Sequence, residues 1–445
     1  MGSMTELEPL VLEQMEKWNV PGVTVGIYDG DDVEFAGFGI TNIETGQPVA
    51  PETLFQIGSI SKIFTATLAM TLVDDGLLDL DAPIATYVPE LVLADRAARD
   101  AITARQLLTH TAGFYGDRFD DQGTGDDALQ KAVCGFGDLP QQTAPGELYT
   151  YCNAGIDLVG RAIENILGQT FESAMKDRVF DKLGLERSTY FAAEAIRHSV
   201  AVGHEVGGED GLTVSDPWPI PRRSNAAGGV TSNVPELIRF AVMHLRNGAV
   251  GDQRVISEES AIAMRTVQAK ADYIHDRGLA WVIRDIGNVR VVEHAGATNG
   301  FLSRMVLIPE RSFVIAVLTN GEYGTSVHGA IIAKAIENRF GIREASRAHV
   351  SLSPQELDLF VGTFTHQLAD SVITRDENGL VMKRIGHNPF SGESKELGDY
   401  RLSPLSESVF IVDDGALEGS IGELFLNDDG SVRFLRLGGR LGYPV

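Results

Sequence analysis

The stretch Gln56-Ile57-Gly58-Ser59-Ile60-Ser61-Lys62, followed by an apolar run from Ile63 to Leu72, is the one from which we interpret the chain. The run predicts a buried helix that begins at Ser59 and ends at about Asp74. Residues three apart on a helix share a face, so Ser59 and Lys62 are expected to point into the same cleft. A serine hydroxyl needs a base to become a good nucleophile, and an amine in a dry site can be that base because burial lowers its pKa. The helix N-terminus also favours the negative charge that develops.

A structural interpretation of the same residues stays open at this point. A serine ahead of an apolar run commonly caps the helix, and either Ser59 or Ser61 could do so. Short Ser-x-x-Lys patterns also arise by chance. Other parts of the chain are needed to distinguish catalysis from capping.

Composition limits the class of protein. The chain has 445 residues, 43% of them hydrophobic, and no apolar run of about 18 residues that could cross a membrane. A net charge of −25 argues against nucleic acids and anionic membranes as partners, because both attract basic surfaces. The two cysteines, Cys134 and Cys152, form no zinc motif, and no nucleotide-binding motif occurs. We therefore expect no disulfide framework, no metal and no cofactor.

The first residues give an expectation about location. Thr5-Glu6-Leu7-Glu8 has neither the basic nor the apolar segment of a signal peptide. We expect a cytoplasmic protein, with secretion left open.

Strand and helix patterns predict that the two ends of residues 4–345 share one sheet. Two β-rich runs precede the Ser59 helix, four more follow near residue 300, and a helix closes the segment. Because helices lie between these two sets of strands, the pattern predicts an α+β fold, with an antiparallel sheet flanked by helices. The strands are expected at 23–28, 33–40, 279–283, 289–294, 301–308 and 313–319, and the other helices at 7–18, 102–108, 154–166, 171–183, 232–245, 261–269 and 325–340.

Residues 346–445 have a different character. A linker at 346–353 and a short helix at 354–360 lead into short alternating strands, separated by turns such as Asp376-Glu377-Asn378-Gly379. This pattern predicts a small antiparallel β-barrel or sandwich. The chain is therefore predicted to have two domains, 4–345 and 346–445.

Two further motifs place polar side chains on a loop and at a strand end, where functional groups are commonly found. Tyr151-Cys152-Asn153 follows a Pro-Gly turn and directly precedes a helix, and His294-Ala295-Gly296 ends a strand. Taken singly, these residues are commonly a packing tyrosine, a helix-capping asparagine and a strand-end histidine. Within the first motif we interpret Cys152 as a packing residue.

Two nearby features receive structural interpretations. His110 lies in Leu107-Leu108-Thr109-His110-Thr111-Ala112-Gly113 and is expected to satisfy backbone groups at a helix end. The stretch from Gly116 to Gly125 is rich in Asp and Gly and predicts an exposed loop.

With Ser59-x-x-Lys62, Tyr151-x-Asn153 and His294-Ala295-Gly296 in this order, residues 7–340 resemble the serine β-lactamase and penicillin-binding protein superfamily, in particular its class C β-lactamase-like branch. The resemblance implies a β-lactamase/transpeptidase-like sheet with flanking helices. It also implies the site roles: Ser59 as nucleophile, Lys62 as its proton partner and Tyr151 as general base and then acid. By the same resemblance, Asn153 is expected to orient Lys62 and the substrate amide. The N–H groups of Ser59 and Ala297 are expected to form the oxyanion hole, and Gly296 is expected to leave room for substrate along the strand edge.

Position 294 departs from the pattern of penicillin-hydrolysing members, which usually have Lys-Thr-Gly there. A histidine is only partly charged near neutral pH, so His294 is expected to anchor a substrate carboxylate less firmly. This favours peptidase or esterase activity over β-lactamase activity. The C-terminal region resembles the lipocalin-like barrel of several family members, and Arg440 in its final strand is a candidate to bind a substrate carboxylate, with a structural role equally open.

The resemblance implies a serine hydrolase that forms an acyl-enzyme on ester or amide substrates, as an esterase or a D-residue-tolerant peptidase. The first alternative is a penicillin-binding-protein-type thioesterase or peptide cyclase, which transfers the acyl group to an amine. A non-catalytic binding protein is the second. The expected partner is a small-molecule or peptide acyl substrate, and the oligomeric state is left open.

Overall fold

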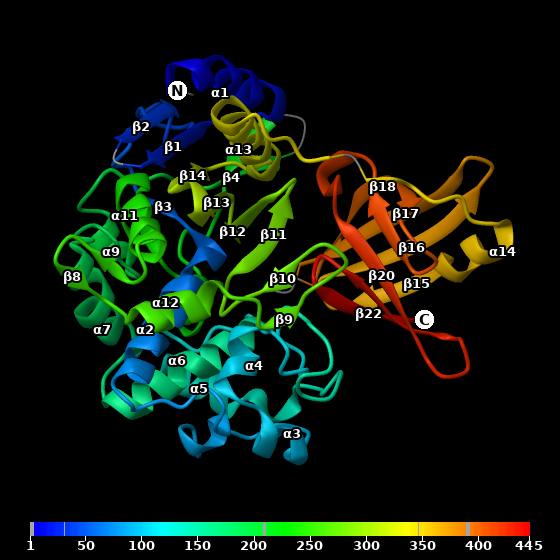
Figure 1. Ribbon diagram of the computed structural model, residues 1–445, viewed down its shortest axis with the longest axis horizontal. Helices are drawn as coiled ribbons and strands as arrows, with labels where there is room; N and C mark the ends of the chain where they lie inside the picture. Colours follow the sequence, from blue (N-terminus) through cyan, green and yellow to red (C-terminus); the bar gives the residue numbers. More distant parts are fainter. Residues whose placement is uncertain (1–3, 31, 208–210, 346, 389–391) are drawn as a thin grey trace.

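The computed structural model describes residues 4–30, 32–207, 211–345, 347–388 and 392–445, which form a larger mixed part and a smaller β-barrel beside it (Figure 1). Asp31, between the two predicted strands at 23–28 and 33–40, and residue 346, the predicted start of the second domain, lie outside the described residues. Among the described residues, no helix has the length and apolarity needed to cross a membrane.

One eight-stranded antiparallel sheet forms the centre of the larger part. Its strands are β1 (Gly22–Asp29), β2 (Asp32–Gly39), β9 (Ala269–Lys270), β10 (Asp276–Arg277), β11 (Val282–Ile286), β12 (Val289–Thr298), β13 (Phe301–Ile308) and β14 (Phe313–Thr319). They lie in the order β2-β1-β14-β13-β12-β11-β10-β9. The N-terminal strand β1 pairs with β14, with Val23 opposite Thr319, so both ends of the segment build one sheet. The prediction of an α+β fold is confirmed.

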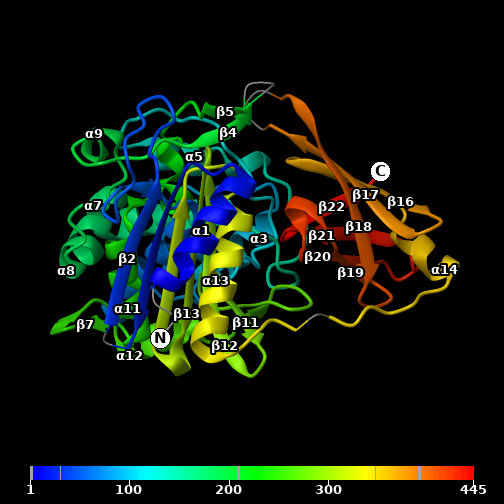
Figure 2. The same cartoon turned by 90° about the horizontal axis from the view of Figure 1, so that it is seen from above.

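Helices cover both faces of this sheet. They are α1 (Met4–Trp18), α2 (Ser61–Asp74), α3 (Arg96–Ala101), α4 (Ala104–Leu108), α5 (Ala128–Cys134), α6 (Asn153–Leu167), α7 (Phe171–Met175), α8 (Asp181–Leu183), α9 (Ala192–Ala195), α10 (Asn225–Gly228), α11 (Val234–Leu245), α12 (Glu258–Arg265) and α13 (Gly324–Phe340). Short two-stranded ladders join β3 (Phe55–Gln56) to β6 (Thr231–Ser232), β4 (His204–Gly207) to β5 (Gly211–Val214), and β7 (Ala249–Val250) to β8 (Gln253–Arg254). Figure 2 shows α1 and α13 together on one face of the sheet.

The pleat of the sheet divides the hydrophobic core into two layers. All seven residues of β14 are buried. Phe313, Ile315 and Val317 pack with α1 and α13, whereas the alternate residues Val314 and Leu318 pack with the helices on the opposite face, including α2. Successive strand residues point to opposite faces, so a residue's position in β12 or β13 decides which layer it faces.

Several boundaries differ from the sequence predictions. The strand predicted at 279–283 begins at Val282, because Ala280 has a left-handed backbone (φ 63°) that ends regular pairing. The helix predicted at 261–269 ends at Arg265, and residues 269–270 form β9. A strand of two residues is too short to show an alternating pattern, so the sequence does not predict β9 and β10.

The barrel is closed by eight antiparallel strands, which confirms the barrel over the sandwich. After α14 (Pro354–Leu357) come β15 (Gly362–His366), β16 (Ala369–Asp376), β17 (Gly379–His387), β18 (Ser394–Pro404), β19 (Val409–Val412), β20 (Ile421–Leu426), β21 (Val432–Leu437) and β22 (Arg440–Pro444). The last two strands meet at Gly438-Gly439, where both residues have positive φ, as a tight hairpin turn requires. This turn contacts the larger part, because Tyr151 N donates to Gly439 O at 2.8 Å.

Candidate active site

Ser59 lies on a short 3-10 turn, Gly58–Ile60, directly before α2 rather than inside it. The capping interpretation does not apply, because Ile60 is the N-cap residue of α2 and makes no side-chain cap bond. Ser61 Oγ instead accepts a hydrogen bond from Val230 N at 3.0 Å. Every residue of α2 from Ser61 to Leu72 is buried. The core therefore fixes the helix, and with it the turn that presents the partly exposed Ser59.

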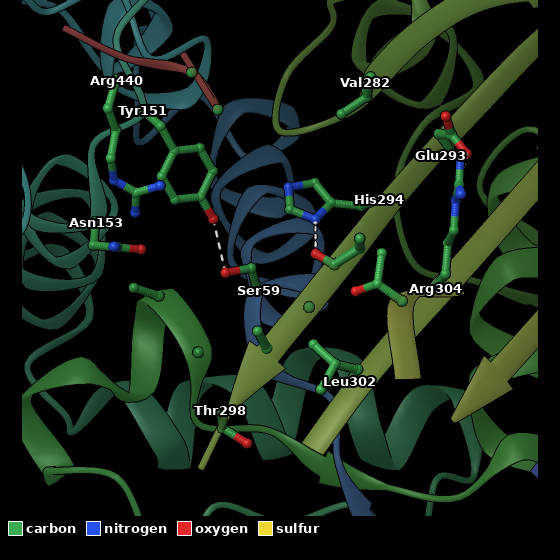
Figure 3. Close-up of a pocket in the computed structure, with 18 of the residues that line it drawn as sticks. Ser59, Tyr151, Asn153, Val282, Glu293, His294, Thr298, Leu302, Arg304 and Arg440 are labelled. Carbon is green, nitrogen blue, oxygen red and sulfur yellow. Dashed lines mark hydrogen bonds and ion pairs between the residues drawn. The ribbon is translucent and has the colours of Figure 1, made fainter. Parts of the chain in front are cut away.

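Two side chains that can carry a proton contact Ser59. Lys62 Nζ donates to Ser59 Oγ at 3.0 Å and to the Ala227 carbonyl oxygen at 2.6 Å. Tyr151 OH donates to Ser59 Oγ at 2.7 Å (Figure 3). Lys62 is completely buried, so its amino group depends on these few polar partners. Either side chain is close enough to exchange a proton with the serine hydroxyl.

The Tyr151 ring is held from several sides. Its face stacks on the His110 ring, with centroids 4.5 Å apart, and Lys62 Nζ and the Arg440 guanidinium lie 4.9 and 5.1 Å from its centre. As predicted, His110 satisfies a backbone group: its Nδ1 accepts from Cys152 N at 3.1 Å. Burial, and then the charges of Arg277 and Lys62, lower the pKa of His110 well below its ordinary value, so its ring is neutral.

The backbone of β12 approaches the serine turn closely. A Cβ on Gly58 would lie 2.5 Å from Ala297 N, and one on Gly296 would lie 2.9 Å from Ser59 N and 2.0 Å from the Ile57 carbonyl oxygen. Glycine at 296 is thus required for packing the strand on the turn, whereas we expected it to leave room for substrate. Ser59 N and Ala297 N, the two groups expected to form the oxyanion hole, thus lie where the turn and the strand meet.

Asp117 organises a group of polar residues that the sequence did not reveal. It is almost fully buried, although it lies in the stretch predicted as an exposed loop. Arg440 Nη2 donates to its Oδ1 at 3.0 Å, and Asn153 Nδ2 donates to the same oxygen at 2.9 Å. Burial alone would raise the pKa of Asp117, but the Arg440 guanidinium outweighs this and lowers it. Arg440 is therefore already paired, and Asn153 contacts Asp117 where a contact with Lys62 was expected.

His294 does not supply a positive charge. It is buried, and its Nδ1 donates to the carbonyl oxygen of the adjacent Ala295 at 2.6 Å. Burial, together with the charges of Arg277 and Lys62, lowers its pKa to about 3. The expectation of a partly charged His294 near neutral pH is corrected: the ring is neutral, and its Nε2 has no hydrogen-bond partner among the described residues.

Arg277 is a buried arginine of the site that has no carboxylate partner among the described residues. Its side chain, on β10, is 8% exposed and donates to the Tyr149 hydroxyl, with the guanidinium 4.6 Å from the ring centre. Its Nε and Nη1 have no partner in the described part of the chain. A buried guanidinium is normally paired, so this one is available to an anionic group of a substrate.

A cavity of about 670 Å³ lies between the sheet, the helices and the barrel. The lining includes Ser59, Tyr151, Asn153, the β12 segment from Glu293 to Thr298, and the barrel residues 419–421 and 438–440. Figure 3 shows side chains from both sides of β12 around it. The barrel thus forms part of the wall of the cavity.

Glu293, on the far side of β12 from Ser59, joins two arginines in a buried cluster. Arg284 Nε donates to it at 2.6 Å and Arg304 Nη2 at 2.8 Å. Burial alone would raise the pKa of Glu293, but Arg304 and Arg284 lower it to about 2. Because the ordinary carboxyl value is 4.5, this shift corresponds to roughly 3 kcal/mol of stability at neutral pH.

We expect Glu293→Gln to destabilise the protein at pH 7 by about 3–5 kcal/mol, since it leaves two arginines without their buried partner. The pH dependence of the protein's stability also changes in this variant. A carboxylate whose folded pKa is lowered stabilises the fold above its unfolded pKa and loses that effect as the pH falls to about 2. Melting temperatures between pH 5 and 2 should therefore fall less steeply in the variant. Glu344→Gln, which removes an exposed partner of Arg284, is the matched control and should change stability by less than about 1 kcal/mol.

Comparisons with known proteins give matches over most of the chain. A family model described as Beta-lactamase matches residues 7–337. Penicillin-binding protein 4 of Amycolatopsis lactamdurans is 34% identical over 362 residues, which cover 78% of this chain and 94% of that protein. The Beta-lactamase of Yersinia enterocolitica is 28% identical over 346 residues, 70% of this chain and 85% of that protein. A crystal structure of SurE matches with a TM-score of 0.77 and 25% identity, and the match covers 99% of both chains, barrel included. A crystal structure of SurE with D-Leu matches with a TM-score of 0.75 and 23% identity, again over 99% of both chains.

Proposed function

The chain belongs to the Beta-lactamase family, and from that premise we propose that it is a serine hydrolase that cleaves esters and amides through an acyl-enzyme on Ser59. The observation that carries this proposal is the position of Ser59 Oγ, which lies within hydrogen-bond distance of both Lys62 Nζ and Tyr151 OH. A serine held in this way, beside two backbone N–H groups, has what acyl transfer needs.

In the proposed reaction, Ser59 Oγ attacks the substrate carbonyl carbon while the Lys62–Tyr151 pair accepts its proton. The N–H groups of Ser59 and Ala297 stabilise the resulting oxyanion. The leaving group then departs with a proton from the same pair, which leaves the acyl group on Ser59. A water molecule, deprotonated by that pair, attacks the ester carbon, and the pair returns the proton to Ser59 Oγ as the acid is released.

Ester or peptide substrates, including those with D-residues, are the substrate class that we propose. The neutral His294 supports this choice, because it cannot pair with a carboxylate as a lysine would. The similarity to SurE, which has been crystallised with D-Leu, supports tolerance of D-residues.

The first experiment is hydrolysis of a short-chain p-nitrophenyl ester, with the intact mass of the protein measured in parallel. We expect release of p-nitrophenol and an acyl adduct that peptide mapping locates on Ser59. Release without an adduct on Ser59 would contradict the acyl-enzyme route. Neither release nor an adduct, over a panel of esters, thioesters and peptides, would favour a binding protein instead.

Acyl transfer to an amine is the second candidate. The cavity volume of about 670 Å³ supports it, because an acyl-enzyme whose acyl chain is a peptide needs such room to fold its own amine back onto the ester carbon. Mass spectrometry of the products of a peptide ester separates the candidates. A hydrolysed product contains one added water, whereas a cyclised product has lost only the leaving group.

Arg277 is proposed to bind a carboxylate on the leaving group. We expect Arg277→Gln to lower kcat/KM by about 10- to 100-fold for substrates whose leaving group carries a free carboxylate, which is the range for a hydrogen bond to a charged group. The amidated forms of the same substrates should change by a few-fold at most. The measurement is steady-state kinetics on matched acid and amide pairs.

Arg277→Lys is the matched variant for this prediction. It keeps the positive charge but loses the planar guanidinium that donates two hydrogen bonds. We therefore expect kcat/KM for the acid substrates to recover in part. If Arg277→Gln lowers kcat/KM equally for acid and amide substrates, Arg277 does not bind substrate but holds the site in place through its bond to Tyr149.

A further inference from the structure

The cavity continues around the free edge of β12 to the other face of the sheet. On the β11 side, the pairing ends with Val282 opposite Glu293, and among the described residues no strand pairs with His294–Thr298 there. His294 and Gly296 face the Ser59 layer, so the alternate residues Ala295 and Ala297 face α13. In Figure 3, Tyr151 and Asn153 lie on one side of the strand, and Glu293 and Arg304 lie on the other.

The part of the cavity on the second face is here named the α13-side compartment. It is lined by Ala295, Ala297, Leu302, Arg304, Thr325 and His328. The two alanines are exposed, and their small side chains leave the space above the strand open. Barrel residues 419–421 line the same cavity. The compartment is thus continuous with the site at Ser59.

A buried histidine in this compartment lacks hydrogen bonds. His328 is 1% exposed, and neither of its ring nitrogens has a partner among the described residues. Buried polar groups in proteins are nearly always paired, so two unpaired ring atoms in a cavity wall call for an external partner. Burial, and then the charge of Arg304, lower the pKa of His328 to about 3, so the ring offers one donor and one acceptor.

The charges around the compartment cancel. Arg284 pairs with both Glu293 and Glu344, and Arg304 pairs with Glu293, which gives two positive and two negative groups. Among the described residues that line this compartment, a charged side chain of a substrate would find no unmatched opposite charge, and it would lose its hydration. A carboxamide has one acceptor oxygen and a donor NH₂ group, which match the neutral imidazole.

We propose that the α13-side compartment binds the side chain of the substrate residue next to the acyl residue, and that it prefers a carboxamide, as in Asn or Gln. This inference rests on the proposed function. A peptide that pairs with the free edge of β12 adds an extended strand, and its successive side chains point to opposite faces. Because the acyl residue lies against Ser59, Tyr151 and Asn153, the side chain of its neighbour points toward Leu302 and His328.

The test uses N-acetyl dipeptide p-nitrophenyl esters with alanine as the acyl residue and Asn, Leu, Asp or Lys before it. Leu has nearly the shape of Asn but cannot form hydrogen bonds. We expect kcat/KM for the Asn ester to exceed that for each of the others by at least about 10-fold, since a site that hydrogen-bonds a side chain rejects analogues that cannot pair. p-Nitrophenyl acetate, which is too short to reach the compartment, is the reference substrate.

Two variants locate the preference. His328→Phe should reduce the ratio of kcat/KM for the Asn ester to kcat/KM for the Leu ester to near one. Ala295→Leu, which fills the compartment from the strand, should lower kcat/KM for every dipeptide ester relative to p-nitrophenyl acetate. If His328→Phe does not fold, Ala295→Leu alone tests whether the compartment binds the side chain. Lys334→Ala, on the same helix outside the cavity lining, is the control and should keep the wild-type ratios.

The outcomes separate this inference from the proposed function. Absence of an Asn preference in a wild-type protein that still turns over acetate would overturn the inference and leave the function standing. The same holds if the preference persists in folded His328→Phe or if Ala295→Leu leaves the dipeptide esters unaffected. Failure of acetate turnover and of acylation would instead overturn the function on which the inference rests.

Discussion

Replacing Ser59 by alanine is expected to lower ester turnover by on the order of 10⁴- to 10⁶-fold and to abolish the acyl adduct. Ser59 Oγ is the atom to which both Lys62 and Tyr151 donate, so its loss removes the nucleophile and the acceptor of both bonds at once. Lys62 keeps its bond to the Ala227 carbonyl oxygen, and α2 stays buried. The melting temperature should therefore stay within a few degrees of wild type. p-Nitrophenol release and intact mass are the measurements.

Ser61→Ala is the matched control for this prediction, because it removes the other serine hydroxyl of the same stretch. Its Oγ accepts the buried Val230 N–H, so the variant should lose about 1 kcal/mol of stability but still form the adduct. If Ser61→Ala abolishes the adduct and Ser59→Ala does not, the nucleophile has been assigned to the wrong residue.

Local sequence patterns were sufficient for the parts of the site that lie close together along the chain. Ser59 and Lys62 are three residues apart, and the apolar run after them requires a buried helix, so their contact follows from helical geometry. The strands that bring His294 and Gly296 to the serine turn are short β-rich runs that follow one another along the chain. The antiparallel sheet could be predicted from such runs, and the barrel from the alternating strands and turns after residue 353.

The residues that sequence reasoning missed depend on partners far away along the chain. Asp117 meets Arg440 across 323 positions, and nothing near Asp117 distinguishes it from the other acids of its loop. Arg277 lies on a two-residue strand without periodicity, and only the fold shows that it is buried without a carboxylate. His294 could be placed by its motif, but its neutrality results from burial beside Arg277 and Lys62. Position along the chain thus predicts which groups are present, whereas their charge states and pairings depend on tertiary contacts.

Replacing Tyr151 by phenylalanine is expected to reduce turnover by about 10²- to 10⁴-fold, the usual contribution of a positioned proton carrier. The substitution removes the hydroxyl that donates to Ser59 Oγ at 2.7 Å and leaves the ring. The ring keeps its stacking on His110, and the backbone N–H keeps its bond to Gly439, so the loop and the barrel contact should remain in place. The measurement is ester kinetics with the melting temperature as a check on the fold.

Tyr190→Phe is the matched control, because it removes a buried tyrosine hydroxyl that has no hydrogen-bond partner among the described residues. It should turn over substrate at the wild-type rate. If Tyr151→Phe also retains wild-type turnover, Lys62 alone exchanges the proton with Ser59, since its Nζ is the other proton carrier in contact with that oxygen. An acyl adduct that forms in Tyr151→Phe but is not released would instead mean that Tyr151 acts chiefly when water attacks the acyl-enzyme, which the time course of the intact mass would show.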